Sequence, residues 1–555
     1  MSAFGIDLGT TNSVIARLVL GRPQAIPIDG SAIVPSVVLY EDHRVVVGRE
    51  AHNLELQRPE RTLRSVKRRM GSAHEWQVGD RTVRAEAASS EILGRLRRGA
   101  EAATGETVSD VVITVPAYFD EGQRRATLKA GELAGLNVLR LLNEPTAASL
   151  VYDHLGRDGA PPDEPQLVLV YDLGGGTFDV SILEVFNDIR EVRASTGNTH
   201  LGGDDFDDAL VQKFLVALRT QGVDVREDRV AMARLRRVAE ETKIRLSTET
   251  SALVREEFLA THEGVAIHLD VTVTRRELEG LIEELLVSTI ELAKKAIADA
   301  GIEAEDLSRI CLVGGSTRIP KVRELLEEAF HVEVHEEIDP DLAVALGAAI
   351  QAGLLAGEPV ERILVDVTSH SLGVCVLGEY DELDADTFAH IIRRNTVLPT
   401  TRSEEFYTIV DRQPSVLVSV YQGESSRTSE NTLVGEFSFA LEPSPAGTPV
   451  TCAFTYTLDG TVDVRVEQSG GNRVEKTLAV ADSSGRSARA TAPSTSNRDR
   501  GPSNAVEKQA ERLLATLEGA TRENLAKLLA DYRGRAGNER ESAEEALLDF
   551  FLEHE

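Results

Sequence analysis

The sequence predicts a multidomain protein in which an α/β region of two lobes precedes an all-β region and a short α-helical segment. Three observations predict this organisation. Residues 1–357 alternate short β-branched runs with amphipathic helical stretches. Segments of period two follow, to about residue 480, and apolar residues at helical spacing end the chain. A length of 555 residues also predicts several domains, at about 100–200 residues per domain.

The α/β region contains an internal duplication. Residues 4–11 give a strand that ends in Asp-Leu-Gly-Thr-Thr, and residues 168–177 give a strand that ends in Asp-Leu-Gly-Gly-Gly-Thr. Each half later carries another strand that enters a small-residue turn, at 111–117 and at 310–320. Two copies of one unit predict two lobes whose loops face each other across a cleft. Other expected elements are strands at 111–115, 167–171 and 310–313, and helices at 228–247, 275–300 and 322–329.

The pattern of apolar and polar residues changes after Gly357. Residues 363–365 form a small apolar patch, and short alternating segments then predict a β-sandwich. Residues 481–504 are rich in Ser, Ala, Arg, Thr and Pro, which predicts a flexible linker. Residues 505–555 predict about three short helices. The expected parts are 1–357, a linker at 358–367, a β-sandwich at 368–480 with strands at 415–421, 436–441, 451–456 and 461–467, a linker at 481–504, and a helical tail at 505–555.

Net charge, cysteine content and apolar runs exclude several classes of partner and location. The net charge of −31 makes nucleic acid and anionic membrane poor partners. Three widely spaced cysteines predict neither a metal site nor a disulfide framework. No signal peptide is visible, and no apolar run reaches the ~18 residues that a transmembrane helix needs. We therefore expect a cytoplasmic protein.

The duplicated loops have the chemistry of phosphate-binding turns. Gly9 permits close backbone approach, and the amides of Thr10 and Thr11 can donate to phosphate oxygens. Asp7 can hold the water shell of Mg²⁺. Asp172 with the turn Gly174, Gly175, Gly176 and Thr177 offers the same groups from the second lobe. One such turn recurs by chance, but two at corresponding positions predict a nucleotide site.

Three further groups of residues fit a nucleotide but also have plain structural interpretations. Gly202 and Gly203, like Gly314, Gly315, Ser316 and Arg318, suit backbone that passes close to ribose and base, or ordinary loop-to-helix turns. Glu240, Lys243 and Ser247 share one helix face, which suits the adenosine end or a solvated polar stripe.

Four segments together resemble the signatures of the heat shock protein 70 (DnaK) family. They are residues 5–13, 143–148, 172–179 and 314–320. The similarity runs from the N-terminus to about residue 480 and implies an actin/hexokinase-like ATPase of two lobes joined to a peptide-binding β-sandwich. The short stretch between Arg69 and Asp110, with the lone Trp76, resembles the shorter bacterial paralogues of the HscC type.

The resemblance implies roles for individual residues. Lys67 resembles the lysine that orients the attacking water, and Glu144, Asp172 and Thr177 resemble the rest of the catalytic set. Asp7 and Asp172 would hold Mg²⁺ through water, and K⁺ is left open as a second cation beside ATP or ADP. The family pattern further assigns a proline switch and its arginine relay to Pro116 and Arg124, J-domain contact to Arg140, and coupling to Leu364 and Asp366 in the linker. The plain alternatives are surface charge for Lys67 and an exposed helix position for Arg124.

The β-region matches the family's peptide-binding domain at residues 371–374, 395–400 and 421–424. By this resemblance the cleft residues are Val374, Leu377, Phe406, Ile409 and Val416, each of which can equally be sandwich core. Ile409 stands where many relatives carry a small residue. The tail is far shorter than the family's usual helical lid, so we expect a weakly clamped, fast-exchanging client site.

The expected function is an ATP-dependent chaperone that binds and releases apolar peptide segments. Its expected partners are unfolded or extended apolar peptides, a J-domain co-chaperone and a nucleotide exchange factor, with no nucleic acid or membrane partner. Two alternatives stay open. One is a nucleotide-gated scaffold with a single dedicated partner. The other, more remote, is a sugar or metabolite kinase on the same fold, although a kinase does not require the linker and β-region.

Overall fold

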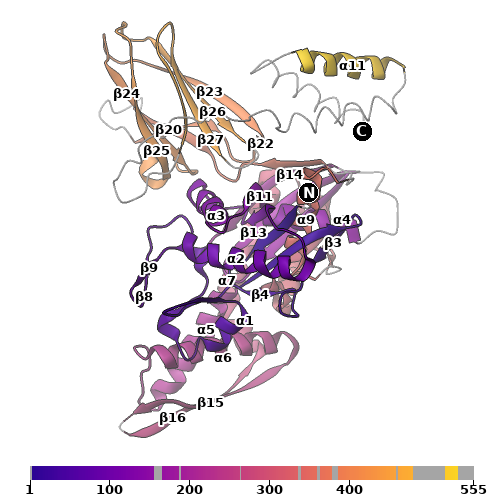
Figure 1. Cartoon of the computed structure of the whole chain (residues 1–555), viewed down its shortest axis with the longest axis vertical. Helices are drawn as coiled ribbons and strands as arrows, with labels where there is room; N and C mark the ends of the chain where they lie inside the picture. The colour runs from indigo at the N-terminus through magenta and orange to yellow at the C-terminus, as the bar shows by residue number, and fades with distance from the viewer. Residues whose placement is uncertain are drawn as a thin grey trace. The chain divides into compact units, whose positions relative to one another are not determined.

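The computed structural model describes residues 3–155, 165–186, 189–262, 264–335, 339–358, 363–377, 386–457, 461–478 and 519–534 (Figure 1). The chain divides into two compact units, Met1–Gly485 and Arg486–Glu555. The predicted linker at 481–504 and most of the predicted helical tail lie outside the described residues. In the second unit, helix α11 (Gly519–Gly534) buries Leu525, Leu529 and Tyr532.

A six-stranded sheet forms the base of the first lobe. Its order is β11-β10-β1-β2-β3, and β4 pairs with β2. Strands β1, β10 and β11 are parallel, whereas β2 runs antiparallel to β1 and to β3. The strands are β1 (Phe4–Leu8), β2 (Asn12–Val19), β3 (Arg22–Ala25), β4 (Val34–Pro35), β10 (Asp110–Val115) and β11 (Asn137–Asn143).

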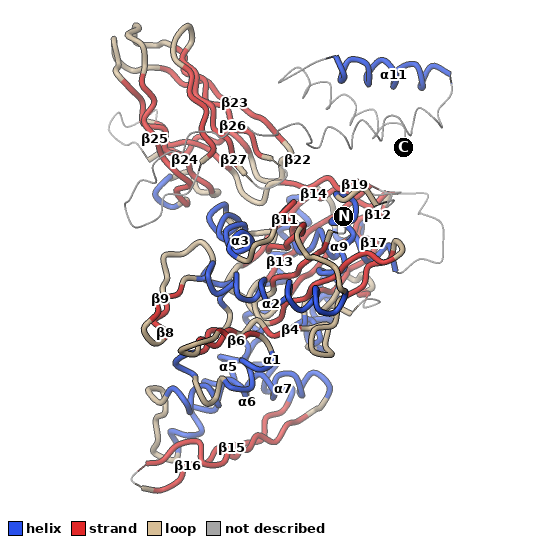
Figure 2. The backbone as a smooth tube through the Cα atoms, viewed as in Figure 1, coloured by secondary structure: helices blue, strands red, loops and turns tan. Residues whose placement is uncertain are grey.

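The second lobe repeats this sheet strand for strand. Its seven-stranded sheet, of which Figure 2 labels β17, β12, β13, β14, β19 and β22, has the order β18-β17-β12-β13-β14-β19-β22. The part β18-β17-β12-β13-β14 matches β11-β10-β1-β2-β3, with the same parallel and antiparallel pairs. The predicted duplication is confirmed by this order. The strands are β12 (Gln166–Leu173), β13 (Phe178–Phe186), β14 (Ile189–Asn198), β17 (Leu307–Val313), β18 (Val334–His335), β19 (Ile363–Val367) and β22 (Val397–Leu398).

Small residues let two helices pack closely between the lobes. Helices α4 (Glu144–Leu155) and α9 (Ala343–Leu355) share one apolar core with residues of both sheets. A Cβ on Gly347 would lie 1.7 Å from the carbonyl oxygen of Ala147, and one on Gly5 would lie 2.1 Å from the amide nitrogen of Ala349. Glycine at these two positions therefore sets how closely α9 approaches α4 and β1.

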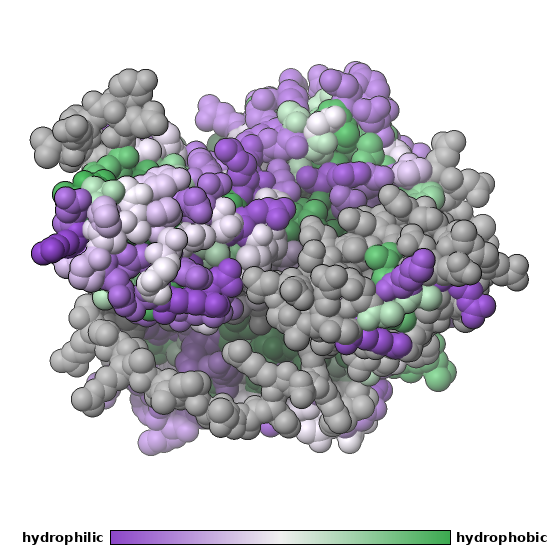
Figure 3. All heavy atoms as spheres, turned by 90° about the horizontal axis from the view of Figure 1, so that it is seen from above, coloured by the Kyte–Doolittle hydropathy of each residue, from purple (hydrophilic) through white to green (hydrophobic). Residues whose placement is uncertain are grey.

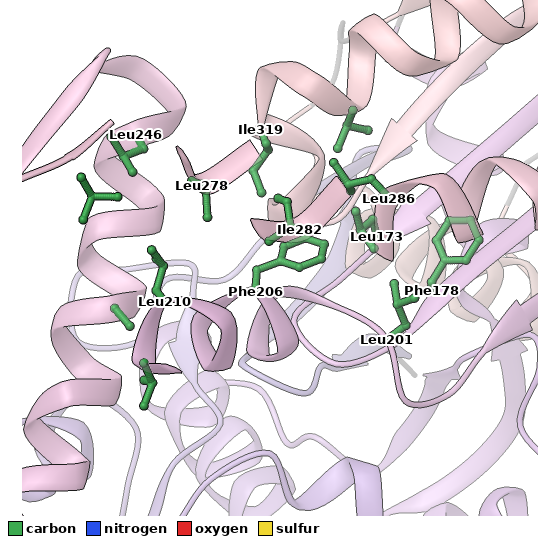
Figure 4. Packing of buried hydrophobic residues seen from close by; sticks show 14 of the residues in the cluster. Leu173, Phe178, Leu201, Phe206, Leu210, Leu246, Leu278, Ile282, Leu286 and Ile319 are labelled. Atoms are coloured by element: carbon green, nitrogen blue, oxygen red, sulfur yellow. The ribbon is translucent and has the colours of Figure 1, made fainter. Parts of the chain in front are cut away.

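The second lobe has a large core of its own. Helices α5 (Gly203–Thr220), α6 (Arg229–Thr248) and α7 (Arg275–Ala300) pack around Phe206, Leu246 and Ile282 (Figure 4). The predicted helices appear with small shifts at their ends. The remaining helices and strands of the α/β region are α1 (Arg49–Leu54), β5 (Val38–Tyr40), β6 (Val45–Val47), β7 (Thr62–Leu63), β8 (Trp76–Val78), β9 (Arg81–Val83), α2 (Ala85–Thr104), α3 (Glu121–Leu133), α5 (Gly203–Thr220), α6 (Arg229–Thr248), β15 (Ser251–His262), β16 (Val265–Thr274), α7 (Arg275–Ala300) and α8 (Pro320–Phe330).

The β-region forms two four-stranded antiparallel sheets, β21-β20-β24-β25 and β23-β26-β27-β28. They enclose a core that includes Val420, Phe439 and Phe454, all completely buried. The predicted strands are present, although β25 begins at Thr432, four residues before the expected start at Glu436. The strands are β20 (Leu372–Val376), β21 (Thr387–Ile392), β23 (Thr400–Tyr407), β24 (Ser415–Gln422), β25 (Thr432–Ala440), β26 (Pro449–Tyr456), β27 (Val462–Gln468) and β28 (Arg473–Thr477).

Two further features of the fold bear on function. The apolar patch of the predicted linker is strand β19, which joins the second-lobe sheet beside β14. On the face shown in Figure 3, polar residues cover much of the described surface, with smaller apolar patches between them. None of the described helices is both long and apolar enough to cross a membrane.

Candidate active site

The two predicted phosphate loops lie against each other. A Cβ on Gly175 would stand 1.8 Å from Thr11 Oγ1, and one on Gly176 would stand 2.5 Å from Thr10 Cγ2. The loops can approach this closely because the second lobe presents glycines. Thr11 Oγ1 is buried and has no hydrogen-bond partner among the described residues. A buried polar atom at a meeting point of two loops indicates a ligand position.

The other predicted glycines close the floor of the same site. A Cβ on Gly202 would lie 2.6 Å from the Gly176 amide nitrogen, and one on Gly314 would lie 2.4 Å from the Leu173 carbonyl oxygen. Gly314 also has a φ of 82°, which a side chain would strain. A Cβ on Gly315 would meet the Asp341 carboxylate at 2.8 Å. The sequence motifs thus converge on one place from four separate turns, those at Gly9, Gly174, Gly202 and Gly314.

A cluster of acidic side chains lies at the ends of the central strands. Glu144, Asp172 and Asp179 are buried, and Asp7 is half-buried. Burial, followed by repulsion from Glu144, raises the pKa of Asp7 and of Asp179 to about 7 and raises the pKa of Asp172 well above its ordinary value. Lys67 is the cation that acts on all three of these aspartates. One ammonium does not balance four carboxylates, so the charge of the cluster favours a bound cation.

The acidic cluster suits a hydrated cation. No group of three His, Cys, Asp or Glu side chains in the described ranges is arranged to bind a metal directly. Mg²⁺ dehydrates reluctantly and keeps several waters when it binds through one or two carboxylates and nucleotide phosphates. The donor set therefore fits Mg²⁺ held through water.

Lys67 is placed inside the cleft by a short helical turn, Val66–Arg69. Its side chain is 4% exposed and forms an ion pair with the Glu144 carboxylate. Burial at this level rules out the plain interpretation of Lys67 as a surface charge. Ser65, just before the turn, has a φ of 51° and donates its hydroxyl to Asp204 at 2.6 Å. The turn thereby carries Lys67 inward while it binds the opposite lobe.

Two arginines that the sequence analysis did not single out also cross between the lobes. Arg64 pairs with Glu240 at 2.7 Å. Arg68 donates to the Gly176 carbonyl at 3.0 Å and pairs with Asp205. Both lie in the basic segment around Lys67. This run of positive charge is the sequence feature that could have indicated them. The separation of 176 residues between Arg64 and Glu240 hid the pairing.

The residues expected at the adenosine end are only partly brought together. Lys243 donates to the Gly203 carbonyl and to Asp207, each at 2.9 Å, and Ser316 donates to the Gly174 carbonyl at 2.9 Å. Ser247 bonds within its own helix to the Lys243 carbonyl at 3.5 Å. Arg318 pairs with Asp339 and Asp341 at 2.7 and 2.9 Å. A cavity of 850 Å³ is lined in part by Arg64, and Glu240 is the only predicted ATP-binding residue among the residues that line it.

A buried polar path leads from the acidic cluster to strand β19. Asn143 precedes Glu144 in the chain and accepts a hydrogen bond of 2.6 Å from Arg124. Its amide nitrogen donates to both carboxylate oxygens of Asp366, each at 3.1 Å. Arg124 is buried, so it is not an exposed helix residue. Burial raises the pKa of Asp366, and the charge of Arg140 acts against that rise.

The β-sandwich also contacts the two-lobe region. Arg394 and Asp299 form a two-pronged ion pair with both bonds at 2.7 Å. The Glu121 amide donates to Gln422 at 2.9 Å. Ser369 donates its hydroxyl to the Ala117 carbonyl, one residue after Pro116. These contacts and β19 hold the sandwich against the ends of β10 and α7.

The predicted peptide-cleft residues separate by exposure. Leu377 and Ile409 are 44% and 65% exposed, whereas Phe406 and Val416 are half-buried against the sandwich core. Val374 is 5% exposed and packs in the sandwich core, which is one of the two interpretations that the sequence left open for it. Tyr407 and Val410, exposed beside Ile409, were not singled out from the sequence.

Comparison with known proteins identifies the class to which this fold and site belong. The family model described as Hsp70 protein matches residues 3–549. The chain is also 42% identical over 476 residues to proteins named chaperone protein DnaK from two strains of Halobacterium salinarum, R1 and NRC-1. Each match covers 85% of this chain and 74% of the relative. The chain belongs to the Hsp70 family.

Membership of this family settles the activity at the level of class. The protein is an ATP-dependent chaperone that hydrolyses ATP, and it binds ATP and ADP. The sequence-based prediction of family and function is confirmed. No finding supports the dedicated scaffold or the kinase.

Proposed function

We propose that this chain couples ATP hydrolysis between its two lobes to the grip of its β-sandwich on extended apolar peptides. The observation that carries the proposal is the buried path from Lys67 and Glu144 through Asn143 to Asp366 in β19. Each member of this path contacts or adjoins the next, so a change at the phosphates has a short physical route to the linker. The domain limits in this proposal are those expected from the sequence, with 1–357 as the ATPase and 368–480 as the peptide-binding domain.

In the proposed reaction, Lys67 orients the attacking water with Glu144, Asp172 and Thr177. Phosphoryl transfer to water depends mainly on positioning and charge neutralisation, which these groups can provide. The amides of the Gly9 and Gly174 turns would donate to phosphate oxygens. When bound, Mg²⁺ would neutralise phosphate charge, and Asp7 and Asp172 would hold its water shell.

The arrangement described above corresponds, in this proposal, to the ATP-bound state. Strand β19 then pairs with β14, and Arg394 pairs with Asp299. Loss of the γ-phosphate would weaken the path at Glu144 and release β19. The free sandwich would then hold its peptide more firmly, which makes β19 the element with two positions that coupling requires.

The finer partners follow from the same proposal. We assign Arg140 to contact with a J-domain co-chaperone and leave ADP release to a nucleotide exchange factor. Leu377 and Ile409 are the exposed members of the expected peptide cleft. We propose that client exchange at this cleft takes place in the cytoplasm.

The test is single-turnover ATP hydrolysis by the full chain, with and without an apolar peptide and a J-domain protein. We expect both additions to accelerate hydrolysis. Lys67→Ala and Thr177→Ala should each slow it by about 10²–10³-fold, the range for loss of one preorganised stabilising group, while ATP binding stays largely intact. Normal turnover in both variants would overturn the site assignment, and stimulation by neither addition would overturn the coupling.

A further inference from the structure

His370 is a titratable residue that the proposed reaction does not use. It lies between β19 and β20, where the chain passes from the two-lobe region to the sandwich. The residue is half-buried, and its Nδ1 is inaccessible to solvent, with no hydrogen-bond partner among the described residues. A ring nitrogen in this position is tolerated while the imidazole is neutral, but a buried N–H⁺ without an acceptor is costly.

The ring of His370 packs across the junction between the two regions. Its centroid lies 4.2 Å from that of Tyr118, in the loop between β10 and α3. The Tyr118 amide donates to Asp179 of the acidic cluster at 3.1 Å. On the other side, the neighbouring Ser369 bonds to the carbonyl of Ala117. His370 therefore sits where the sandwich contacts the loop that leads to the nucleotide site.

The charges around His370 oppose a second positive charge. Burial is the main cause that lowers its pKa far below the ordinary value of 6.5, and Arg124, Arg394 and Lys295 add to this effect. Glu424 lines the same cavity as His370, but its carboxylate already accepts the amide and hydroxyl of Ser371, at 2.8 and 3.1 Å, and lies 3.7 Å from Arg394. The other titratable groups that line this cavity of 410 Å³ are Tyr118, Asp120, His200 and Glu430.

We propose that His370 is a proton-sensitive latch, and that protonation of its imidazole releases the sandwich and β19 from the two-lobe region. The proposal rests on the docked ATP-bound state proposed above. It adds a regulation by acid that acts at the junction and not at the phosphates.

The sign of the pH effect follows from linkage. The docked state holds His370 neutral, whereas a released, solvated histidine has a pKa near 6.5. The contribution of this residue to docking is therefore fully present above pH 6.5 and is lost as pH falls below it. When pH falls from 7.5 to 5.5, protonation of His370 should raise the ratio of released to docked molecules by up to about tenfold. Glu121 and Asp366 work in the opposite direction, because burial raises the pKa of Glu121 to about 7 and also raises the pKa of Asp366.

Because of these opposing groups, the test compares variants and not the wild type alone. We would measure amide hydrogen exchange on the full ATP-bound chain at pH 7.5 and 5.5, and correct it for the pH dependence of intrinsic exchange. The reporters are the amides of Ile363, Leu364 and Val365, which pair with β14. Relative to His370→Leu, wild-type protection should fall by up to about tenfold at pH 5.5. The exposed His200 of the same cavity provides the control, since His200→Gln should follow the wild type.

Two results separate this inference from the proposed function. Amides of β19 that lack protection at pH 7.5 in the wild type would refute the docked state itself. Protection with the same pH dependence in wild type and His370→Leu would refute the latch alone. If His370→Leu does not dock, the wild-type ring is titrated by NMR with ATP bound. A ring pKa below 6.5 in the ATP-bound chain supports the latch, because docking then disfavours the protonated ring, and a ring that titrates near pH 6.5 overturns it.

Discussion

Asn143 provides the sharpest test of the coupling path. Its side chain donates two bonds of 3.1 Å to the buried Asp366 and accepts one of 2.6 Å from Arg124. Asn143→Ala leaves the Asp366 carboxylate without this donor. Hydrogen bonds to a charged group contribute about 1.5–3 kcal/mol, so docking of β19 should weaken by about 10- to 150-fold.

The assay is amide protection of Leu364 and Val365 in the ATP-bound chain, together with peptide-stimulated hydrolysis. Asn137→Ala is a matched control, because Asn137 begins the same strand β11 and donates to Asp110 on the surface at 2.7 Å. An exposed bond of this kind should change protection by less than about threefold. Equal protection and equal stimulation in the two variants would refute the path as the route of coupling.

Two other predictions follow from the cleft. Gly175→Ala should slow hydrolysis by about 10²-fold. The added Cβ would lie 1.8 Å from Thr11 Oγ1 and 2.9 Å from Thr11 Cβ. Because the contact with Thr11 Cβ is the same in every rotamer of Thr11, the two loops must separate. Wild-type turnover in this variant would show that the loops need not touch. Arg64→Met should speed ADP release by about 3- to 10-fold, measured with a fluorescent nucleotide, because it removes the partly exposed 2.7 Å pair with Glu240. Arg61→Met, which breaks a surface pair with Asp42 inside the first lobe, should leave release unchanged, and equal rates in both variants would contradict a gating role for Arg64.

Local sequence was sufficient for the features that depend on short-range geometry. The Asp-Leu-Gly turns, the helix at 275–300 and the period-two strands of the sandwich are each fixed by residues close together in the chain. The duplication was visible because both copies retain the same strand-turn order.

Other features required the folded structure, because they join residues far apart in the chain. Arg64 meets Glu240 across 176 positions, and Asn143 meets Asp366 across 223. Burial also decided Val374, since a strand residue that suits a cleft and one that suits a core have the same apolar character.

By itself, the sequence determined the family, the two-lobe α/β fold and the composition of the phosphate loops. Tertiary structure decided which charges are paired, which apolar residues face solvent, and that β19 belongs to the second-lobe sheet. The reason is that a motif specifies a local backbone shape, whereas pairing and burial depend on which distant segment packs beside it. His370 illustrates the difference, because its local sequence contains no motif. Only its packing against Tyr118 at the junction allows protonation of its ring to affect docking of the sandwich.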